Sequence, residues 1–442
     1  MRRGQGRAGS EVADRAMGAS LAQEETVAAN ARTGIPPGRF QRTFSALRYR
    51  DFRLLWFGAF ASTTGTFMQT LAQGWLVYTM TGSALLLGID GFLSTGPMLL
   101  FSLFGGGIAD RMERRKIMLL SQVLQGSFAL ILAALIYVHT VKIWHIFILS
   151  FLTGSAQSIS GPAYASLLPL LVRRDDMANA VAMNSMQFNL ARVIGPALGG
   201  VVFGLWGATA CFGINGFSFI FVIIALLMIK MPPLQAGATS ASMMAQMKEG
   251  FAFVASKRSL LLLTFLSFAG TFLGMPLFTM MPVVAKKIFN LGPQGLSLLQ
   301  ADYGVGSVVG ALFVAGSSYA LKKGRLALVL QLVFAATLVA FGMSRHFAAS
   351  LVIAFIAGSA IVGVISLYSS LVQLSTGDAM RGRVMSIFML AFRGGMPLGN
   401  LMAGFVAQRW SISTALEVNG IALAVVALVF IIRGTDLDAG LT

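Results

Sequence analysis

The chain has 442 residues, of which 56% are hydrophobic and only 11% are charged, and its mean hydropathy is +0.77. Soluble domains carry about 25% charged residues, so this composition excludes a soluble globular protein. The net charge of +17 would suit nucleic acid, but the basic residues fall in short clusters between apolar runs, which is typical of membrane topology. The single cysteine, Cys211, lies within an apolar run and excludes a disulfide or a cysteine metal site.

The apolar runs predict an all-α membrane protein, because a helix needs about 20 apolar residues to cross a bilayer. They predict twelve transmembrane helices in two sets of six. The first set covers residues 52–79, 85–108, 117–138, 144–170, 179–205 and 209–230. The second set covers residues 259–285, 294–320, 325–343, 348–373, 382–408 and 413–433.

Polar segments mark the expected division of the chain. Residues 1–45 are rich in Arg and Ala, have no apolar core and are predicted to be a disordered cytoplasmic tail. Between the two sets of spans, Met231–Arg258 is a polar linker, and its part Met247–Lys257 is expected to form a surface helix. The expected units are a tail (1–45), an N-terminal bundle (46–230), a cytoplasmic linker (231–258), a C-terminal bundle (259–433) and a second cytoplasmic tail (434–442).

The distribution of Lys and Arg predicts the orientation, because these residues accumulate in cytoplasmic loops. The N-terminal tail, the linker and every second loop are strongly basic. Both termini are therefore expected to be cytoplasmic. The opposite loops hold only Lys142, Lys286, Lys287, Arg345 and Arg409.

The two halves are predicted to be repeats of each other. Tyr164-Ala-Ser-Leu-Leu-Pro-Leu in the fourth span corresponds to Tyr368-Ser-Ser-Leu-Val-Gln-Leu in the tenth. Arg192-Val-Ile-Gly-Pro in the fifth span corresponds to Arg393-Gly-Gly-Met-Pro in the eleventh, at nearly the same separation. Two six-span halves joined by a cytoplasmic linker are one known architecture of secondary transporters.

A glycine-rich, basic segment, residues 105–116, joins the second and third predicted spans. It resembles the loop motif Gly-x-x-x-Asp-Arg-x-Gly-Arg-Arg/Lys of the major facilitator superfamily, with Glu113 in place of the second glycine. Leu47–Arg53 and Arg381–Ser386 resemble segments of the branch that contains the enterobactin exporter and macrolide-efflux proteins. The resemblance covers about residues 45–433 and implies the major facilitator fold, two pseudo-symmetric six-helix bundles.

The resemblance implies a conformational latch in the 105–116 segment. In the family, the loop aspartate and its arginine partners tie the halves together on the cytoplasmic side when the cavity opens outward. Simple charge balance at the membrane surface is the alternative interpretation. The second half lacks the aspartate in Leu321–Arg325, so the latch is expected to be asymmetric. The latch residues are Gly106, Asp110, Arg111, Arg114 and Arg115.

The fifth span resembles the antiporter motif Gly-x-x-x-Gly-Pro-x-x-Gly-Gly, with Ala191 at the first glycine. In the family this motif accompanies exporters, so it favours efflux over uptake. Ordinary tight packing is the alternative, because Gly and Pro are frequent in membrane helices. The residues that permit a kink and close helix contact are Gly195, Pro196, Gly199 and Gly200.

Charged residues within spans are costly unless they face a cavity or a partner. Arg192 and Arg393 form a pseudo-symmetric pair near mid-membrane, and we interpret them as cavity or coupling residues, with helix packing as the alternative. Asp90 and Asp302 form a second pair, nearer the outer ends of the second and eighth spans. These two carboxylates are candidate proton carriers, with snorkelling to the outer headgroups or helix capping as the alternative. Glu417 is expected to be interfacial.

A small group of amide side chains in the first and fifth spans shares a restricted helix face. These residues are weaker candidates for polar anchors in an otherwise apolar cavity, and scattered interhelical hydrogen bonding explains them equally well. They are Gln69, Gln73, Asn184, Gln187 and Asn189.

Together these features predict a proton-coupled exporter of amphipathic small molecules, such as drugs or siderophores, in a bacterial inner membrane. The expected partners are lipid, substrate and protons but not nucleic acid, and the chain is expected to be monomeric. No metal spacing, nucleotide-binding motif or catalytic constellation occurs in the sequence, so we expect neither an enzyme nor a cofactor beyond the proton gradient. An uptake symporter of the same fold is the main alternative, and a transport-inactive receptor is a distant one.

Overall fold

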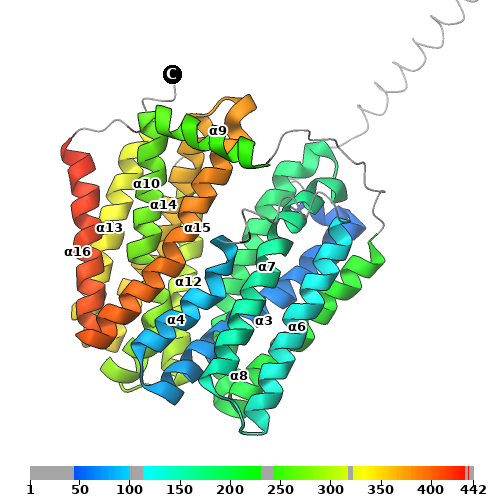
Figure 1. Cartoon of the computed structure of the whole chain (residues 1–442), viewed down its shortest axis with the longest axis vertical. Helices are drawn as coiled ribbons and strands as arrows, with labels where there is room; N and C mark the ends of the chain where they lie inside the picture. The colour runs from blue at the N-terminus through cyan, green and yellow to red at the C-terminus, as the bar shows by residue number, and fades with distance from the viewer. Residues whose placement is uncertain are drawn as a thin grey trace, which may run out of the picture.

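The computed structural model describes residues 44–99, 101, 113–229, 243–316, 322–433 and 437. All regular secondary structure in these ranges is helical, and most helices run side by side along one direction (Figure 1). Eight of the described helical segments are long and apolar enough to cross a membrane by length and composition.

The first half of the chain forms six membrane crossings. α8 spans 52 residues but contains Gly207 with a positive φ of 74°, which interrupts the helix and divides it into the fifth and sixth spans. Glycine adopts this backbone conformation without a steric penalty. α3 packs mainly on α8, and α6 packs on α7 and α8. The helices are α3 (Arg50–Thr81), α4 (Ala84–Thr95), α6 (Arg114–Tyr137), α7 (Ile143–Leu171) and α8 (Met177–Met228), with the short η1 (Ser45–Arg48) and η2 (Arg174–Asp176).

The second half forms six more crossings, so the twelve predicted spans are confirmed. The seventh span consists of three pieces, because Pro276 lacks the N–H that would continue α10 and instead begins α11. The pieces are α10 (Arg258–Gly274), α11 (Pro276–Val283) and the π-helical η3 (Val284–Ile288). The others are α12 (Pro293–Gly316), α13 (Lys323–Met343), α14 (Phe347–Leu374), α15 (Asp378–Arg409) and α16 (Ile412–Ile432).

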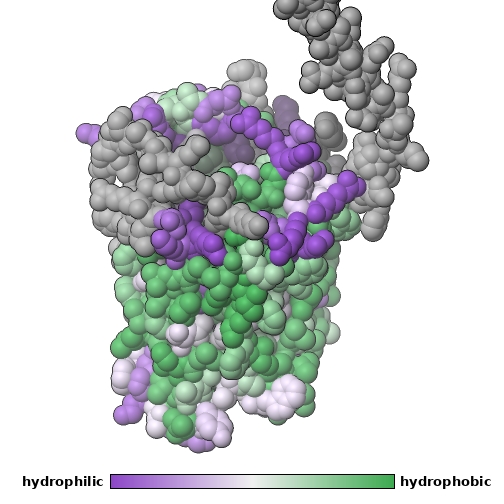
Figure 2. All heavy atoms as spheres, turned by 90° about the vertical axis from the view of Figure 1, so that its right-hand side faces the viewer, coloured by the Kyte–Doolittle hydropathy of each residue, from purple (hydrophilic) through white to green (hydrophobic). Residues whose placement is uncertain are grey.

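The surface of the bundle matches a bilayer. Figure 2 shows a continuous apolar belt between a strongly polar end and a second, paler end. Large apolar side chains such as Leu205, Phe217 and Leu312 are more than half exposed on the outside of the bundle. Hydrocarbon is the solvent that makes such exposure favourable.

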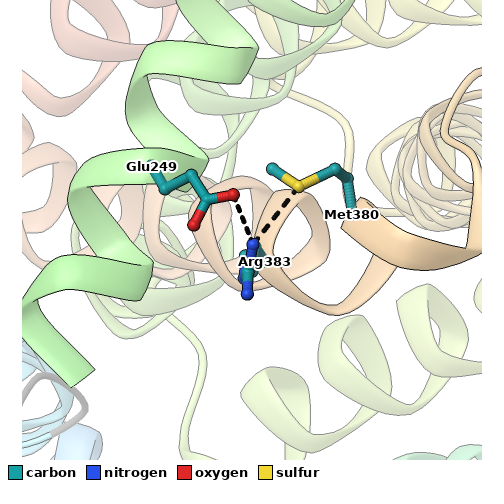
Figure 3. A network of polar contacts seen from close by, with 3 residues as sticks. All are labelled: Glu249, Met380 and Arg383. Atoms are coloured by element: carbon teal, nitrogen blue, oxygen red, sulfur yellow. Dashed lines mark hydrogen bonds and ion pairs between the residues drawn. The ribbon is translucent and has the colours of Figure 1, made fainter. Parts of the chain in front are cut away.

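The predicted surface helix of the linker is confirmed as α9 (Met243–Ser256), which lies across one end of the second half (Figure 1). Glu249 on α9 accepts a hydrogen bond from Arg383 on α15 at 2.5 Å, and Arg383 also contacts the Met380 sulfur (Figure 3). Gly250 lies close to the α15 backbone, and Val254 is buried. Residues 230–242 of the linker lie outside the described residues, as does most of the N-terminal tail.

The halves meet along two glycine-lined seams. In the first seam, α4 packs on α15, and a Cβ added at Gly88 would lie 2.5 Å from the Asn400 carbonyl oxygen. At the end of this seam the Gln408 side-chain oxygen accepts hydrogen bonds from Ser83 Oγ and the Ala84 N–H, at 3.1 and 3.0 Å. Both helices therefore approach to backbone contact.

In the second seam, α8 packs on α12, and a Cβ added at Gly200 would lie 2.3 Å from Ser297 Oγ. One turn further, a Cβ at Gly204 would lie 2.4 Å from the Gln294 amide nitrogen. α15 meets α9 near Arg383, and Gln408 of the first seam lies at the other end of α15. Gln294 of the second seam lies at the start of α12, which follows the span that leads away from α9. The halves are therefore closed together at the end opposite α9.

We expect Gly200→Leu to force the second seam open, because the added side chain has no space beside Ser297. Spin labels are placed at Thr140→Cys, between α6 and α7, and at His346→Cys, between α13 and α14, in a Cys211→Ala background. Double electron–electron resonance then measures the distance between the two halves. The variant should shift this distance distribution to longer values. Gly213→Leu is the matched control, because a Cβ at Gly213 meets open space. An unchanged distribution in Gly200→Leu would contradict the seam.

A polar strap fastens the start of α3 to the α7–α8 connection at the surface. Asp176 accepts hydrogen bonds from Ser45 Oγ and Tyr49 OH, at 2.5 and 2.6 Å, and the Ala46 N–H donates to Asn179 Oδ1 at 2.9 Å. The two hydroxyl donors, with nearby arginines, lower the pKa of Asp176. The same contact raises the pKa of Tyr49, because ionised Tyr49 would face the carboxylate.

The lowered pKa predicts a pH-dependent contribution of the strap to stability. Ionised Asp176 favours folding above its ordinary pKa of 3.8, and this contribution is lost as the pH falls through the lowered value. We therefore expect Asp176→Asn to reduce the thermal unfolding midpoint in detergent at pH 7, and the deficit to shrink toward pH 3. The exposed neighbour substitution Asp175→Asn is the control. A deficit that stays constant over this pH range would exclude the proposed linkage.

Candidate functional site

A cavity of about 860 Å³ lies between the two halves. Five helices of the first half, α3, α4, α6, α7 and α8, supply most of its lining. The second half contributes fewer residues, from α11, α12 and α15, and none of them is charged. Because the seams close the end opposite α9, we interpret the cavity as open toward the end that carries α9.

Asp90 is the acidic residue of this cavity. Its side chain on α4 is only 6% exposed and accepts hydrogen bonds from Gln73 Nε2, at 3.0 and 2.8 Å, and from Ser150 Oγ, at 2.6 Å. The donors come from α3 and α7, so three helices converge on one carboxylate. Two neutral donors hold the ionised carboxylate without supplying a countercharge, which leaves it able to accept a proton.

Arg192 is the basic residue of the cavity. It lines the cavity from α8, and its guanidinium carbon lies 5.3 Å from the centre of the Phe188 ring. Phe188 in turn packs edge-to-face against Phe67 on α3, with ring centres 5.5 Å apart. A cation above an aromatic face is attracted by the electrons of the ring.

The five amide residues predicted as weak cavity candidates all line the cavity. Gln69 accepts a hydrogen bond from Asn215 at 2.6 Å, and Asn184 accepts one from Tyr164 at 2.7 Å. Gln187 Nε2 is buried and has no hydrogen-bond partner in the described residues. All five thus share one cavity, and their role as polar anchors for a substrate stays a prediction.

The other members of the two charge pairs lie elsewhere. Asp302 is partly exposed and is not among the cavity-lining residues, although its neighbour Tyr303 is. Arg393 is exposed and does not line the cavity, but it lies on α15 one turn from Met396, which does. Glu417 is partly buried in the first turns of α16, beside Gly342 of α13. One acid and one base, Asp90 and Arg192, therefore line the same cavity, and both belong to the first half.

The residues of the antiporter motif serve two different contacts. A Cβ at Gly195 would lie 2.5 Å from Phe67 Cβ, and Gly199 lies close to Met68, so these two glycines admit α3. Gly200 instead faces α12 across the second seam. Pro196 is buried inside α8. The motif therefore sets both the packing within the first half and its contact with the second.

The predicted latch is only partly within the described residues, because Gly106, Asp110 and Arg111 lie outside them. Arg114 donates to the Ser166 carbonyl of α7 at 3.2 Å, and Arg115 donates to the Leu227 carbonyl of α8 at 2.7 Å. Both carbonyls lie in the last turns of their helices, where a cation is favourable. In this conformation these two arginines bind within the first half. The latch stays a prediction.

Several cavity residues were not singled out by sequence reasoning. Asn400 on α15 is fully buried, and neither atom of its amide has a hydrogen-bond partner in the described residues. Gln300 on α12 is 2% exposed and has an unpartnered Oε1. Neither residue belongs to a motif or carries a charge. Their only signal was polarity inside an apolar span, which Ser150 and many other residues share.

The fold and the site define a multi-pass membrane transporter of small molecules. Within the residues that the structure describes, no cluster of His, Cys, Asp or Glu could hold a metal ion. Similar overall structures include a mutant of the nucleoside transporter NupG, with a TM-score of 0.71 at 13% identity over 87% of this chain and 99% of that one. The D-xylose–proton symporter has a TM-score of 0.71 at 11% identity over 89% and 99% of the two chains.

Sequence comparison identifies the family. Residues 41–437 match the family described as transmembrane secretion effector, so the chain belongs to this family of the major facilitator superfamily. It is 21% identical to macrolide efflux protein A of Streptococcus pyogenes over 86% of this chain and 96% of that one. It is 26% identical to the staphyloferrin A transporter of Staphylococcus aureus, over 83% and 92%, and 27% identical to the multidrug efflux pump Tap of Mycolicibacterium fortuitum, over 87% and 96%.

Proposed function

We propose that the chain is a proton-coupled exporter of amphipathic small molecules in a bacterial plasma membrane. It has both termini in the cytoplasm, acts as a monomer and uses the proton gradient without a cofactor. The observation that carries this proposal is Asp90, a carboxylate held by neutral donors in a cavity closed at the end opposite α9. The similarity to a macrolide efflux protein and a multidrug efflux pump supports export as the direction.

In this proposal the described conformation is inward-facing. The basic loops place α9 and the termini in the cytoplasm, so the cavity receives substrate from the cytoplasmic side. Its wall combines apolar and aromatic side chains with a few polar anchors, which suits amphipathic molecules of varied shape. Opening of the two seams, with closure of the opposite side, would release the substrate outward.

Asp90 is well placed to couple this movement to protons. It precedes Gly91, and a Cβ at Gly91 would lie 2.8 Å from the Asn400 amide nitrogen and 3.0 Å from Thr279 Cγ2. A proton that binds Asp90 from outside changes the charge directly beside the first seam. The transporter then returns to the inward-facing state with an empty cavity and a protonated Asp90. In that state Asp90 releases its proton to the cytoplasm. We assign the proton site to Asp90 rather than Asp302, because Asp90 alone of the two lines the cavity.

The test is transport in proteoliposomes under an imposed pH gradient, with a fluorescent cationic dye, a macrolide and a catecholate siderophore as substrates. We expect proton-driven movement of at least one of them. Asp90→Asn should abolish the dependence on the pH gradient, because an amide cannot carry the proton, while substrate exchange without a gradient persists. Asp302→Asn tests the alternative carrier, and Asp175→Asn is the surface control.

Two results would contradict the proposal. If Asp302→Asn removes the dependence on the pH gradient and Asp90→Asn preserves it, the assignment of the proton site is wrong. If no substrate moves against its gradient, but a nutrient enters together with protons, the chain is an uptake symporter. The membrane orientation is checked separately by labelling Thr140→Cys from the outside of intact cells with an impermeant thiol reagent.

A further inference from the structure

The guanidinium of Arg192 is an uncompensated charge in the middle of the membrane-spanning region. In the described part of the chain it has no hydrogen bond and no carboxylate partner, and its aromatic contact is the Phe188 ring. An isolated charge at this depth is costly unless a partner or water satisfies it. The attraction to one aromatic ring is too weak to offset such a cost. Arg192 is half-buried and lines the cavity, so an anionic group that enters the cavity can reach it.

The surroundings of Arg192 define what kind of group fits. Phe188 is 44% exposed and lines the cavity, so its face can contact a planar group beside the guanidinium. Across the second seam, a Cβ at Gly304 would lie 3.0 Å from the Arg192 carbonyl oxygen, which places the neighbouring turn of α12 against it. This turn carries Tyr303 and Gln300, and both line the cavity.

The two α12 residues add hydrogen-bonding capacity to the charge. Tyr303 has a hydroxyl that can donate to an anionic oxygen, and Gln300 Oε1 is an acceptor without a partner in the described residues. Arginine binds a carboxylate through two parallel N–H bonds. Arg192 and Tyr303 can therefore donate hydrogen bonds to an acid group of a ligand. Gln300 Oε1 can accept one from a hydroxyl or N–H next to that acid group.

Resting on the proposed exporter function, we propose that Arg192, Phe188, Gln300 and Tyr303 form a subsite for an acidic planar group of the substrate. An aromatic carboxylate with a neighbouring hydroxyl is the chemical class that fits. Such a group contacts α8 of one half and α12 of the other. The substrate thus bridges the second seam at the place where the halves separate.

Binding to the purified protein in detergent tests this subsite. The probe is a fluorescent hydroxynaphthoate, followed by anisotropy, and its neutral amide is the matched ligand. We expect Arg192→Gln to weaken binding of the acid by about tenfold or more, and to leave binding of the amide nearly unchanged. Arg192→Lys, which keeps the charge without the paired N–H groups, should fall between them. Arg409→Gln, an exposed arginine at the outer end of α15, is the control.

A second variant tests the hydroxyl contact. Wild-type protein should prefer hydroxynaphthoate to naphthoate, and Gln300→Leu should remove this preference without the loss of affinity for the acid that Arg192→Gln causes. Binding of tetraphenylphosphonium and the elution profile show that each variant is folded. Equal binding of the acid by wild type and Arg192→Gln would overturn the proposal. Displacement of the acid by chloride would also overturn it, because the subsite would then serve an inorganic anion.

The result can be separated from the test of the exporter. If proteoliposomes pump the cationic dye while the acid does not bind, the subsite is wrong and the exporter stands. If no substrate is pumped but the acid binds through Arg192, the subsite stands and the exporter fails. Binding of the acid in detergent depends on Arg192 and Gln300, whereas pumping of the cationic dye does not require an acid group.

Discussion

Polar groups in the hydrocarbon region are expensive, and this constraint explains most of the architecture. The outer face of the bundle carries an apolar belt (Figure 2), and a group of polar side chains from several spans lines one internal cavity. Asp90 is tolerated there because Gln73 and Ser150 donate to it from two other helices. Where no such partner exists, as at Arg192, the unmet charge indicates binding. The free-energy cost of a charge in the membrane therefore marks Arg192 as part of the proposed substrate subsite.

The two seams follow from a different property, the absence of side chains. Glycines allow α4 and α15, and α8 and α12, to meet at backbone distance. Such contacts exclude water from one end of the cavity without a charged gate. Buried side chains of both halves, among them Leu71, Met281 and Leu299, also belong to one apolar cluster. Closure at this end therefore combines backbone contact with apolar packing.

Where their ends fall within the described residues, most of the spans that hydropathy predicted agree with the helices to within a few residues, because bilayer thickness sets helix length. Helical spacing put Gln69, Gln73 and Gln187 on restricted faces, and all three line the cavity, while their part in substrate binding stays a prediction. Repeat symmetry was a weaker guide: it paired Asp90 with Asp302, yet α12 turns Gln300 and Tyr303 inward instead. Asn400 had no signal, since an uncharged amide in an apolar span is common. Which face of each helix turns inward depends on packing between distant segments, which the sequence pattern does not contain.

The duplicated tyrosines show how the halves have diverged. Tyr164 lines the cavity and donates to Asn184, whereas its counterpart Tyr368 is fully buried against Gln331. Both charged residues that line the cavity likewise come from the first half, and the second half lines it with uncharged residues. In such an exporter the two halves contribute differently to the cavity. Substitutions that change the substrate range are therefore expected mainly in α3, α7 and α8, together with the cavity-lining turn of α12 that carries Gln300 and Tyr303.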